Sequence, residues 1–251
     1  MNESQNIYDN PVFFEGYRKL RAREDNHNVL LEQPAMAELI PDLRGKTVLD
    51  LGCGYGNNCR NFIMRGACRV VGIDVSHKML EVAKTENDLP QIEYRHLDMA
   101  NISALSEMFD FVYSSLAFHY VEDLGKLMSD IYALLNPAGM LLYSQEHPIT
   151  TATADDGGHF NRDENGNPVS YTFSNYNESG KREFSWFVDG VVKYHRPMGE
   201  ILTTIAKTGF VIDAVCEPTP KPWAIEKNPK LVKEWTCPCF FIVRARKENK
   251  R

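Results

Sequence analysis

The chain lacks the features that would place it at once among nucleic-acid-binding or membrane proteins. Its 251 residues include 28 lysines and arginines against 34 aspartates and glutamates, a formal net charge of −6. Binding to a nucleic-acid backbone needs a basic surface, which this composition does not provide. No apolar run reaches the length that spans a bilayer, and residues 1–6 lack the apolar stretch of a signal peptide. We therefore expect a cytoplasmic protein without nucleic-acid or membrane partners.

The chain also lacks cysteine pairs with the spacing of a zinc site. Its six cysteines are Cys53, Cys59, Cys68, Cys216, Cys237 and Cys239. Zinc-binding pairs are usually separated by two to four residues, whereas a single proline separates the last two cysteines. We expect all six cysteines to be reduced, and we expect no metal site.

What the chain does contain is a glycine-rich loop behind an apolar run. Gly52, Gly54 and Gly56 follow the run 48–51, which is typical of a buried parallel strand. Glycines let the backbone turn sharply and let a ligand approach main-chain N–H groups. A helix is expected next, with its N-terminus facing the same point. The pattern predicts a loop that binds a nucleotide cofactor, and a purely structural turn is the alternative.

The spacing of the glycines distinguishes between two cofactors. The dinucleotide fingerprint G-x-G-x-x-G would have its third glycine at position 57, where the chain has Asn57. The negative charge of Asp50 would repel a pyrophosphate but would suit the ammonium group of an amino-acid tail. The loop therefore favours S-adenosylmethionine over NAD.

Two further apolar runs end in acids, and both acids suit an adenosine site. The first run ends at Asp74, about 20 residues after the loop, where a carboxylate can accept hydrogen bonds from both ribose hydroxyls. The second ends at Asp98, which is placed to accept a hydrogen bond from the exocyclic amine of adenine. Ser76 is expected to cap the helix that follows the first acid.

Strands and helices alternate through the middle of the chain, which predicts a parallel sheet covered on both faces. We expect strands near 46–51, 69–74, 92–97, 109–114 and 139–144, and helices at about 56–66, 76–86, 100–107 and 122–135. Aromatic residues at helical spacing and the run 30–40 predict helices before the sheet. After it we expect a helix at 201–208 and strands at 210–216 and 240–245.

Between residues 147 and 196 the pattern changes to turn signals and aromatic residues. The Asp189-Gly190 pair between apolar residues predicts a hairpin turn. An insertion after the fifth strand lies at the carboxyl edge of the sheet, where α/β proteins bind ligands. Its aromatic residues favour the roof of a substrate pocket, and a surface hairpin is the alternative.

Successive motifs resemble those of the class I, Rossmann-like, S-adenosylmethionine-dependent methyltransferases. They are Asp50 to Gly56, Val71 to Met79, His96 to Met99, Phe109 to Tyr120 and Leu134 to Tyr143. Weaker similarity at 13–17, 114–123, 146–148 and 192–196 is to a bacterial small-molecule methyltransferase group. The resemblance implies an α/β fold with a seven-stranded doubly wound sheet of order 3-2-1-4-5-7-6, its last strand antiparallel. We divide this single domain into an N-terminal helical lid (1–41), a cofactor-binding core (42–146), a substrate cap insertion (147–196) and a C-terminal helix with strands (197–251).

The resemblance also implies which residues bind S-adenosylmethionine and its product S-adenosylhomocysteine. They are Tyr17, Arg21, Asn28, Asp50, Gly52, Cys53, Gly54, Asn58, Asp74, Val75, Met79, Leu97, Asp98, Met99, Ser114, Ser115 and His119. The first three would fold over the cofactor carboxylate, and ordinary helix packing and surface charge are the alternative for them.

Candidates for the acceptor side of the site follow the fourth and fifth strands and close the insertion. The catalytic candidates are His119, His147 and His195, and the substrate-binding candidates are Tyr120, Glu146, Trp186, Tyr194, His195 and Arg196. A general base helps only where the accepting atom is protonated. An arginine at 196 would suit a carboxylate or phosphate. Packing against adenosine is the alternative for His119, and a turn position before proline is the alternative for His147.

We expect methyl transfer to a small molecule by in-line displacement, in a monomer or homodimer. Two other functions stay open: an RNA or protein methyltransferase, which a basic open groove would favour, and a cofactor-binding protein without catalysis. The sequence also leaves open the accepting atom, which can be O, N, S or C.

Overall fold

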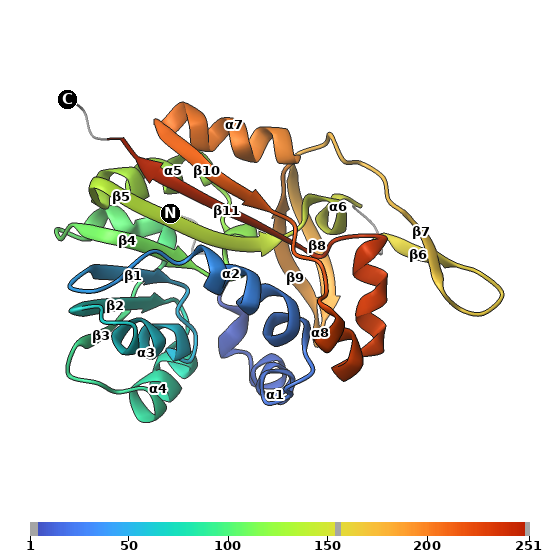
Figure 1. Cartoon of the computed structure of the whole chain (residues 1–251), viewed down its shortest axis with the longest axis horizontal. Helices are drawn as coiled ribbons and strands as arrows, with labels where there is room; N and C mark the ends of the chain where they lie inside the picture. The colour runs from blue at the N-terminus through green and yellow to red at the C-terminus, as the bar shows by residue number, and fades with distance from the viewer. Residues whose placement is uncertain (1–4, 154–156, 249–251) are drawn as a thin grey trace.

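A seven-stranded sheet forms the centre of the fold, with strand order β10-β11-β5-β4-β1-β2-β3 (Figure 1). The computed structural model describes residues 5–153 and 157–248. The strands are β1 (Thr47–Leu51), β2 (Arg69–Asp74), β3 (Ile92–His96), β4 (Phe109–Ser114), β5 (Leu135–Glu146), β10 (Phe210–Cys216) and β11 (Phe240–Lys247). β1 to β5 pair in parallel, and β11 is antiparallel to both β5 and β10. The predicted order 3-2-1-4-5-7-6 is confirmed, because β10 and β11 are the sixth and seventh strands of this sheet.

Alternate residues of the strands pack into two cores, one on each face of the sheet. On one face, α5 (Leu124–Leu134), α7 (Met198–Thr208) and the 3-10 helix η3 (Met99–Ala104) cover residues such as Leu49 and Val112. On the other face, α2 (Gln33–Leu39), α3 (Asn57–Met64) and α4 (His77–Glu86) cover Val48 and Phe111. Strands covered on both faces are apolar along most of their length, which is why they could be located from the sequence.

Local signals decide where these helices begin and end. The Oγ of Ser76 accepts the N–H of Met79 at 3.1 Å, so the predicted cap of α4 is confirmed. The segment expected as a helix at 100–107 is instead the shorter η3, with Asn101 outside helical φ/ψ values. Gly209, at φ +104°, ends α7 in the left-handed conformation that favours glycine.

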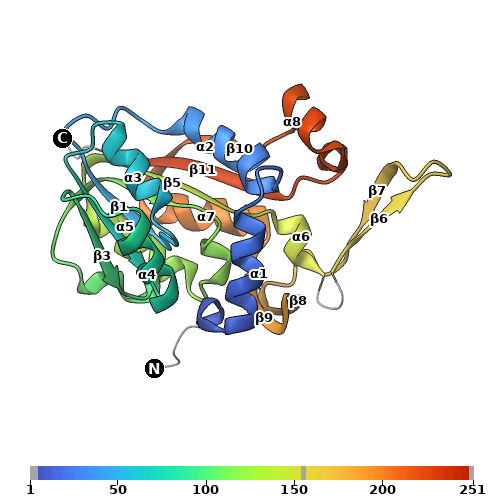
Figure 2. The same ribbon diagram turned by 90° about the horizontal axis from the view of Figure 1, so that it is seen from below.

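The N-terminal segment forms short helices beside the carboxyl ends of the strands (Figure 2). They are η1 (Ile7–Asp9), α1 (Pro11–Arg21), the π-helical turn η2 (Asn28–Glu32) and α2. The Oδ1 of Asn10 caps α1 by accepting the N–H groups of Val12 and Phe13. Leu30 packs against Ala224 and Leu231 of α8 (Pro222–Lys227) and η5 (Pro229–Trp235), which precede β11.

The insertion after β5 contains the helix α6 (Pro148–Ala152) and two hairpins. The hairpin of β6 (His159–Arg162) and β7 (Pro168–Thr172) extends away from the body in both views, whereas that of β8 (Gly180–Trp186) and β9 (Val188–His195) lies beside α1 (Figures 1 and 2). The prediction of a turn at Asp189-Gly190 is wrong. The chain reverses at Phe187, and positions 189 and 190 lie within β9. Packing of Phe187 against Phe13 outweighs the local turn preference.

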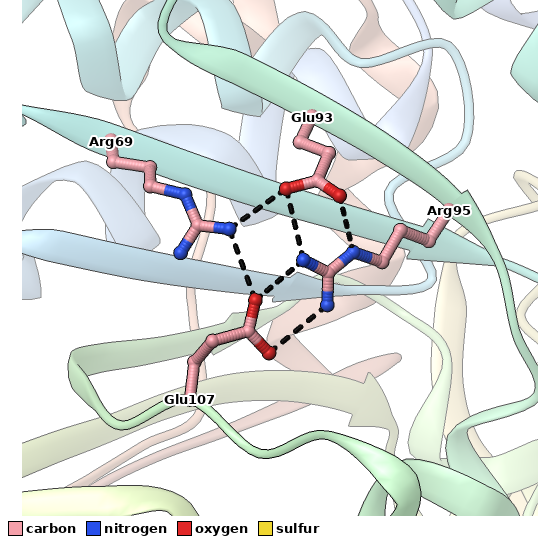
Figure 3. A network of polar contacts seen from close by, with 4 residues as sticks. All are labelled: Arg69, Glu93, Arg95 and Glu107. Atoms are coloured by element: carbon pink, nitrogen blue, oxygen red, sulfur yellow. Dashed lines mark hydrogen bonds and ion pairs between the residues drawn. The ribbon is translucent and has the colours of Figure 1, made fainter.

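An ion network joins the edge strand β3 to its neighbours (Figure 3). Arg69 of β2 and Arg95 of β3 both contact the carboxylates of Glu93 and Glu107, at distances from 2.5 to 3.0 Å. Hydrogen bonds from Arg95 lower the pKa of Glu107 to about 2. The network ties the segment before β4 to β2 and β3.

Across residues 5–153 and 157–248, no helix is long and apolar enough to cross a membrane. Among the same residues, no three His, Cys, Asp or Glu side chains gather into a metal-binding group. The six cysteines are free.

Candidate active site

A cavity of about 620 Å³ opens at the carboxyl ends of the parallel strands. Its wall is formed by the loops that follow β1 to β5, by the N-terminal segment and by the β8–β9 hairpin. The carboxyl edge of an open α/β sheet is where ligands bind. The predicted site residues that line it are Tyr17, Arg21, Asn28, Gly52, Cys53, Gly54, Asn58, Asp74, Val75, Met79, Leu97, Asp98, Met99, Ser115, His119, Tyr120, Glu146 and Trp186.

The glycine loop presents bare backbone to this cavity. Gly52, Gly54 and Gly56 have φ values of +70°, +54° and +76°, which side chains with a Cβ rarely adopt. A Cβ added to Gly54 would meet no atom within 4 Å, so the cavity reaches the main chain there. The N–H groups of Gly52 and Cys53 both donate to the carbonyl of Ile73, which fixes the loop against β2.

A buried carboxylate stands beside the loop. Asp74 accepts the N–H of Gly54 at 2.9 Å with one oxygen and the N–H of Ser76 at 2.8 Å with the other. Burial raises the pKa of Asp74, and these backbone donors oppose the rise. Asp98 lies further along the same wall and accepts the N–H of Ala100 at 2.9 Å. Bare backbone and two acids give this half of the cavity the groups that an adenosine and its ribose hydroxyls require.

A polar relay connects the N-terminal segment to the sheet. Arg21 donates to the Oδ1 of Asn28, and the Nδ2 of Asn28 donates to Glu32 at 2.8 Å. Glu32 is fully buried and also accepts from the hydroxyls of Ser115 at 2.8 Å and Ser144 at 2.5 Å. Burial raises the pKa of Glu32, whereas the two hydroxyls lower it. The relay holds Arg21 and Asn28 at the cavity wall, where they can meet an amino-acid carboxylate.

The other half of the cavity contains an ion pair. The Nζ of Lys193 lies 2.6 and 2.8 Å from the two carboxylate oxygens of Glu146. It also lies 4.9 Å from the ring centre of Phe184 and 5.6 Å from that of Trp186, so the cation is bordered by aromatic faces. Burial, the largest effect, raises the pKa of Glu146, but the charge and hydrogen bonds of Lys193 together with the His119 ring outweigh it and hold that pKa below its usual value.

His119 borders this ion pair as a neutral hydrogen-bonding group. Burial lowers the pKa of His119 to about 4, although the charge of Glu146 opposes the shift. Its Nδ1 accepts the N–H of Glu146 at 3.3 Å, which leaves the proton of the neutral ring on Nε2. The Nε2 atom lies 3.9 Å from a carboxylate oxygen of Glu146. The ring is therefore arranged to donate toward the cavity wall rather than to accept a proton.

The same combination of sheet order and glycine loop occurs in known proteins. Residues 49–143 match a family described as a methyltransferase domain. An uncharacterised protein of Haemophilus influenzae is 39% identical over 226 residues, covering 87% of this chain and 88% of that protein. The crystal structure of an S-adenosylmethionine-dependent methyltransferase from Mesorhizobium loti is 36% identical, with a TM-score of 0.80, and covers 86% of this chain and 97% of that one. The chain belongs to the S-adenosylmethionine-dependent methyltransferases.

More distant methyltransferases share the fold. Magnesium protoporphyrin IX methyltransferase from Synechocystis, solved with bound S-adenosylhomocysteine, is 17% identical with a TM-score of 0.59, and 96% of each chain is covered. The predicted family, fold and enzyme class are thereby confirmed, and the family's cofactor is S-adenosylmethionine.

Two of the methyltransferase's predicted cofactor contacts lie beneath the cavity wall. The carboxylate of Asp50 is buried and accepts the thiol of Cys59 at 3.3 Å, and burial raises the pKa of Asp50 to about 7. The hydroxyl of Ser114 donates to the carbonyl of Leu51 at 2.8 Å. Both side chains support the loop from the sheet side and do not line the cavity.

Two of the three candidate histidines also lie outside the cavity, and structural partners hold their rings. The Nε2 of His147 lies 2.7 Å from Glu217, and its Nδ1 accepts the N–H of Ile149. His195 is fully buried, with its Nδ1 2.9 Å from the hydroxyl of Thr151 and its Nε2 2.8 Å from a backbone carbonyl. Of the three histidines, the structure brings only His119 to the cavity.

The last two predicted substrate contacts face away from the cavity. Arg196 donates to the backbone carbonyls of Val121, at 2.7 Å, and Glu122. Its guanidinium lies over the ring of Tyr194, 5.9 Å from the centre. Neither side chain lines the cavity. Arg196 instead binds the backbone that follows His119 and Tyr120, on the side away from the cavity.

The predicted site residues did not include Lys193, Glu32, Tyr8 and Phe184, all of which border the cavity or its polar relay. Strand alternation carried a signal for the first of these. Residues 191, 193 and 195 of β9 are buried, while 192 and 194 are more exposed. Alternation alone would have placed Lys193 and His195 on the inner face and Tyr194 on the outer one. No sequence pattern indicated Glu32, because two of its three partners come from distant segments: Ser115 follows β4, and Ser144 lies in β5.

Proposed function

We propose that this methyltransferase transfers a methyl group to a small, polar acceptor molecule bound beneath the β8–β9 hairpin, by in-line displacement. The observation that carries the proposal is the Glu146–Lys193 ion pair in the wall of the same cavity as the glycine loop and Asp74. A single cavity of about 620 Å³ then serves both cofactor and acceptor, which suits a small molecule better than a polymer.

The residues of the first half would hold the cofactor. Gly52 and Gly54, which carry no Cβ, would let the cofactor approach the main chain, and Asp74 would accept hydrogen bonds from the ribose hydroxyls. Arg21 and Asn28, held by Glu32, would meet the amino-acid end. Bound S-adenosylmethionine supplies a methyl group already activated by a sulfonium charge. The chain's tasks are therefore to align the acceptor and to exclude water.

The second half would align the acceptor. Glu146 offers carboxylate oxygens, while Lys193, Tyr120 and the neutral His119 offer donors. The ion pair is neutral overall. Glu146 would repel a strongly anionic acceptor at short range, and Lys193 would repel a strongly cationic one. The arrangement favours an acceptor that has adjacent hydrogen-bond donor and acceptor groups, with Glu146 holding the donor.

The proposal is tested with cofactor labelled in its methyl group. The purified protein is incubated with the small-molecule, RNA and protein fractions of one cell extract. Label entering the small-molecule fraction, and lost in Asp74→Ala, supports the proposal. Label entering RNA or protein, or no transfer with any fraction while the cofactor binds, contradicts it and favours the other two functions.

A further inference from the structure

The β8–β9 hairpin lies beside helix α1, although the two are far apart in the sequence (Figure 2). Residues of both elements line the cavity. The rings of Phe13 and Trp186 meet edge to face with centres 5.2 Å apart, and those of Phe13 and Phe187 with centres 5.5 Å apart. Tyr17, which lines the cofactor half, lies 6.1 Å from Trp186, which lines the acceptor half. Aromatic pairs at such distances contribute beyond the area they bury.

The centre of this contact is a notch in α1 at Gly16. A Cβ built at Gly16 would lie 2.6 Å from the Cδ1 of Phe187 and 2.8 Å from its Cγ, so the ring occupies the space a side chain would need. Gly16 has no positive φ that would require glycine, and glycine inside a helix is unfavourable. The close approach of the Phe187 ring therefore explains why position 16 is a glycine.

Phe187 itself adopts a costly conformation. Its φ is +60°, a value that bulky residues rarely take. Such strain persists only where the surroundings hold the residue in place. Phe187 as a whole is 41% exposed, so burial in a core does not hold it in this conformation. The contact of its ring with Gly16 and Phe13 holds Phe187 in this conformation.

Hydrogen bonds anchor the residues before α1 at two points, Gln5 and Asp9. At one end, the side chain of Gln5 donates to the carbonyl of Gly190 and accepts the N–H of Val192, both at 2.8 Å, and so grips β9. Further along, Asp9 accepts the hydroxyl of Ser76 at 2.6 Å and the N–H of Lys78 at 3.1 Å, at the start of α4. The segment thus links the residues beside Asp74 to the hairpin.

We propose that Gly16 and Phe187 are positioning residues that couple the two halves of the site. Seating of Phe187 on Gly16 fixes Trp186 and Lys193 over the acceptor half. Cofactor contacts with Tyr17 and Arg21 order α1 and thereby strengthen this seat. By linkage, a bound cofactor raises the affinity for the acceptor, and the acceptor raises the affinity for the cofactor equally. The inference rests on the proposed function only in naming the hairpin as the acceptor wall.

Hydrogen exchange with S-adenosylhomocysteine as the probe tests the coupling without an acceptor. In the wild type, the product should slow exchange in both 8–28 and 184–193. In Phe187→Ala, slowing should persist in 8–28 but be lost in 184–193. Phe173→Ala is the matched control, because Phe173 is 40% exposed on the same insertion and contacts Tyr171 and Tyr176 rather than α1. The control should retain slowing in both segments.

A double-variant cycle identifies the notch itself. Gly16→Ala alone should displace the ring and abolish the slowing in 184–193, but in the Phe187→Ala background it should change nothing further. Additive effects, or slowing in 184–193 that survives Phe187→Ala, would overturn the coupling. Calorimetric binding of the product, measured in parallel, shows whether the cofactor site itself is intact. Failure of the labelled-extract experiment, by contrast, would leave the exchange result standing and reject only the proposed acceptor.

Discussion

The ammonium group of Lys193 is held by both carboxylate oxygens of Glu146, at 2.6 and 2.8 Å, although 47 positions separate the two residues in the chain. The side chain of Lys193 is 9% exposed and that of Glu146 is 25% exposed. Removing two charges from water is costly, and a buried pair is weak evidence for stability alone. Its position in the cavity wall instead suits a role in aligning the acceptor.

Lys193→Met should leave the carboxylate of Glu146 without its cation. Because the largest interaction that opposes burial would be lost, the pKa of Glu146 should rise, and the free energy of unfolding at pH 7 should fall by about 1–3 kcal/mol. This is less than for a fully buried pair, since Glu146 is partly exposed. Urea denaturation measures it. Lys193→Met combined with Glu146→Gln should recover most of the loss, and an equal or larger loss in the double variant would contradict the account.

Asp74→Ala should weaken binding of S-adenosylhomocysteine by about 1.5–3 kcal/mol, the scale of charge-assisted hydrogen bonds to ligand hydroxyls. Isothermal titration calorimetry measures this change, and NAD should give no binding heat. Asp163→Asn, on the exposed β6–β7 turn, is the control and should bind normally. Undiminished affinity in the Asp74 variant would remove the ribose role from this residue.

His119 should stay neutral well below the pH at which an exposed histidine is protonated. Its folded pKa of about 4 lies below the ordinary 6.5, so the unfolded chain binds more protons between these values. Stability should therefore fall as the pH drops from 6.5 to 4, by about 3 kcal/mol from this residue. Nitrogen NMR of the imidazole should show the Nε2–H tautomer at pH 7. A protonated ring at pH 6 would refute the low pKa and the acceptor role of Nδ1 toward the N–H of Glu146, and His119→Gln should flatten this part of the stability profile.

Arg95→Gln should reduce the acid sensitivity that comes from the network at β3. The pKa of Glu107 is lowered from 4.5 to about 2, so its contribution is present above 4.5 and is lost as the pH falls toward 2. At pH 7 the variant should lose about 1 kcal/mol of unfolding free energy, because the groups are partly solvated. Lys181→Gln, which breaks an exposed pair with Glu183, should lose almost nothing. Equal losses in the two variants would show that the network adds nothing beyond a surface pair.

Arg196→Gln should loosen the segment 117–123 because the carbonyls of Val121 and Glu122 lose their donor. Hydrogen exchange in that segment should quicken, while calorimetric affinity for S-adenosylhomocysteine stays nearly unchanged. Arg246→Gln is the control, since Arg246 pairs with Asp213 on the far strands of the sheet. If exchange in 117–123 did not change, Arg196 would have no positioning role there.

The sequence by itself determined the sheet and the edge of it at which the candidate site lies. Buried strands are apolar along their length, and the caps and turns beside them depend on residues only a few positions apart. For that reason β2 and β4 could be located to the residue, and the acids at 74 and 98 could be placed on one edge. Parallel strands bring their carboxyl ends together, so successive strand ends were enough to predict a shared site.

Only the tertiary structure decided which polar side chains face the cavity. His147 and His195 looked like candidates for chemistry, but contacts with Glu217 and Thr151 from other segments occupy their rings. Strand alternation places Lys193 on the inner face of β9, but its pairing with Glu146 at the end of β5 depends on segments far apart in the chain. The reversal at Phe187 rather than at Asp189-Gly190 has the same cause. Contacts between distant segments outweigh the small free-energy differences on which local preferences depend.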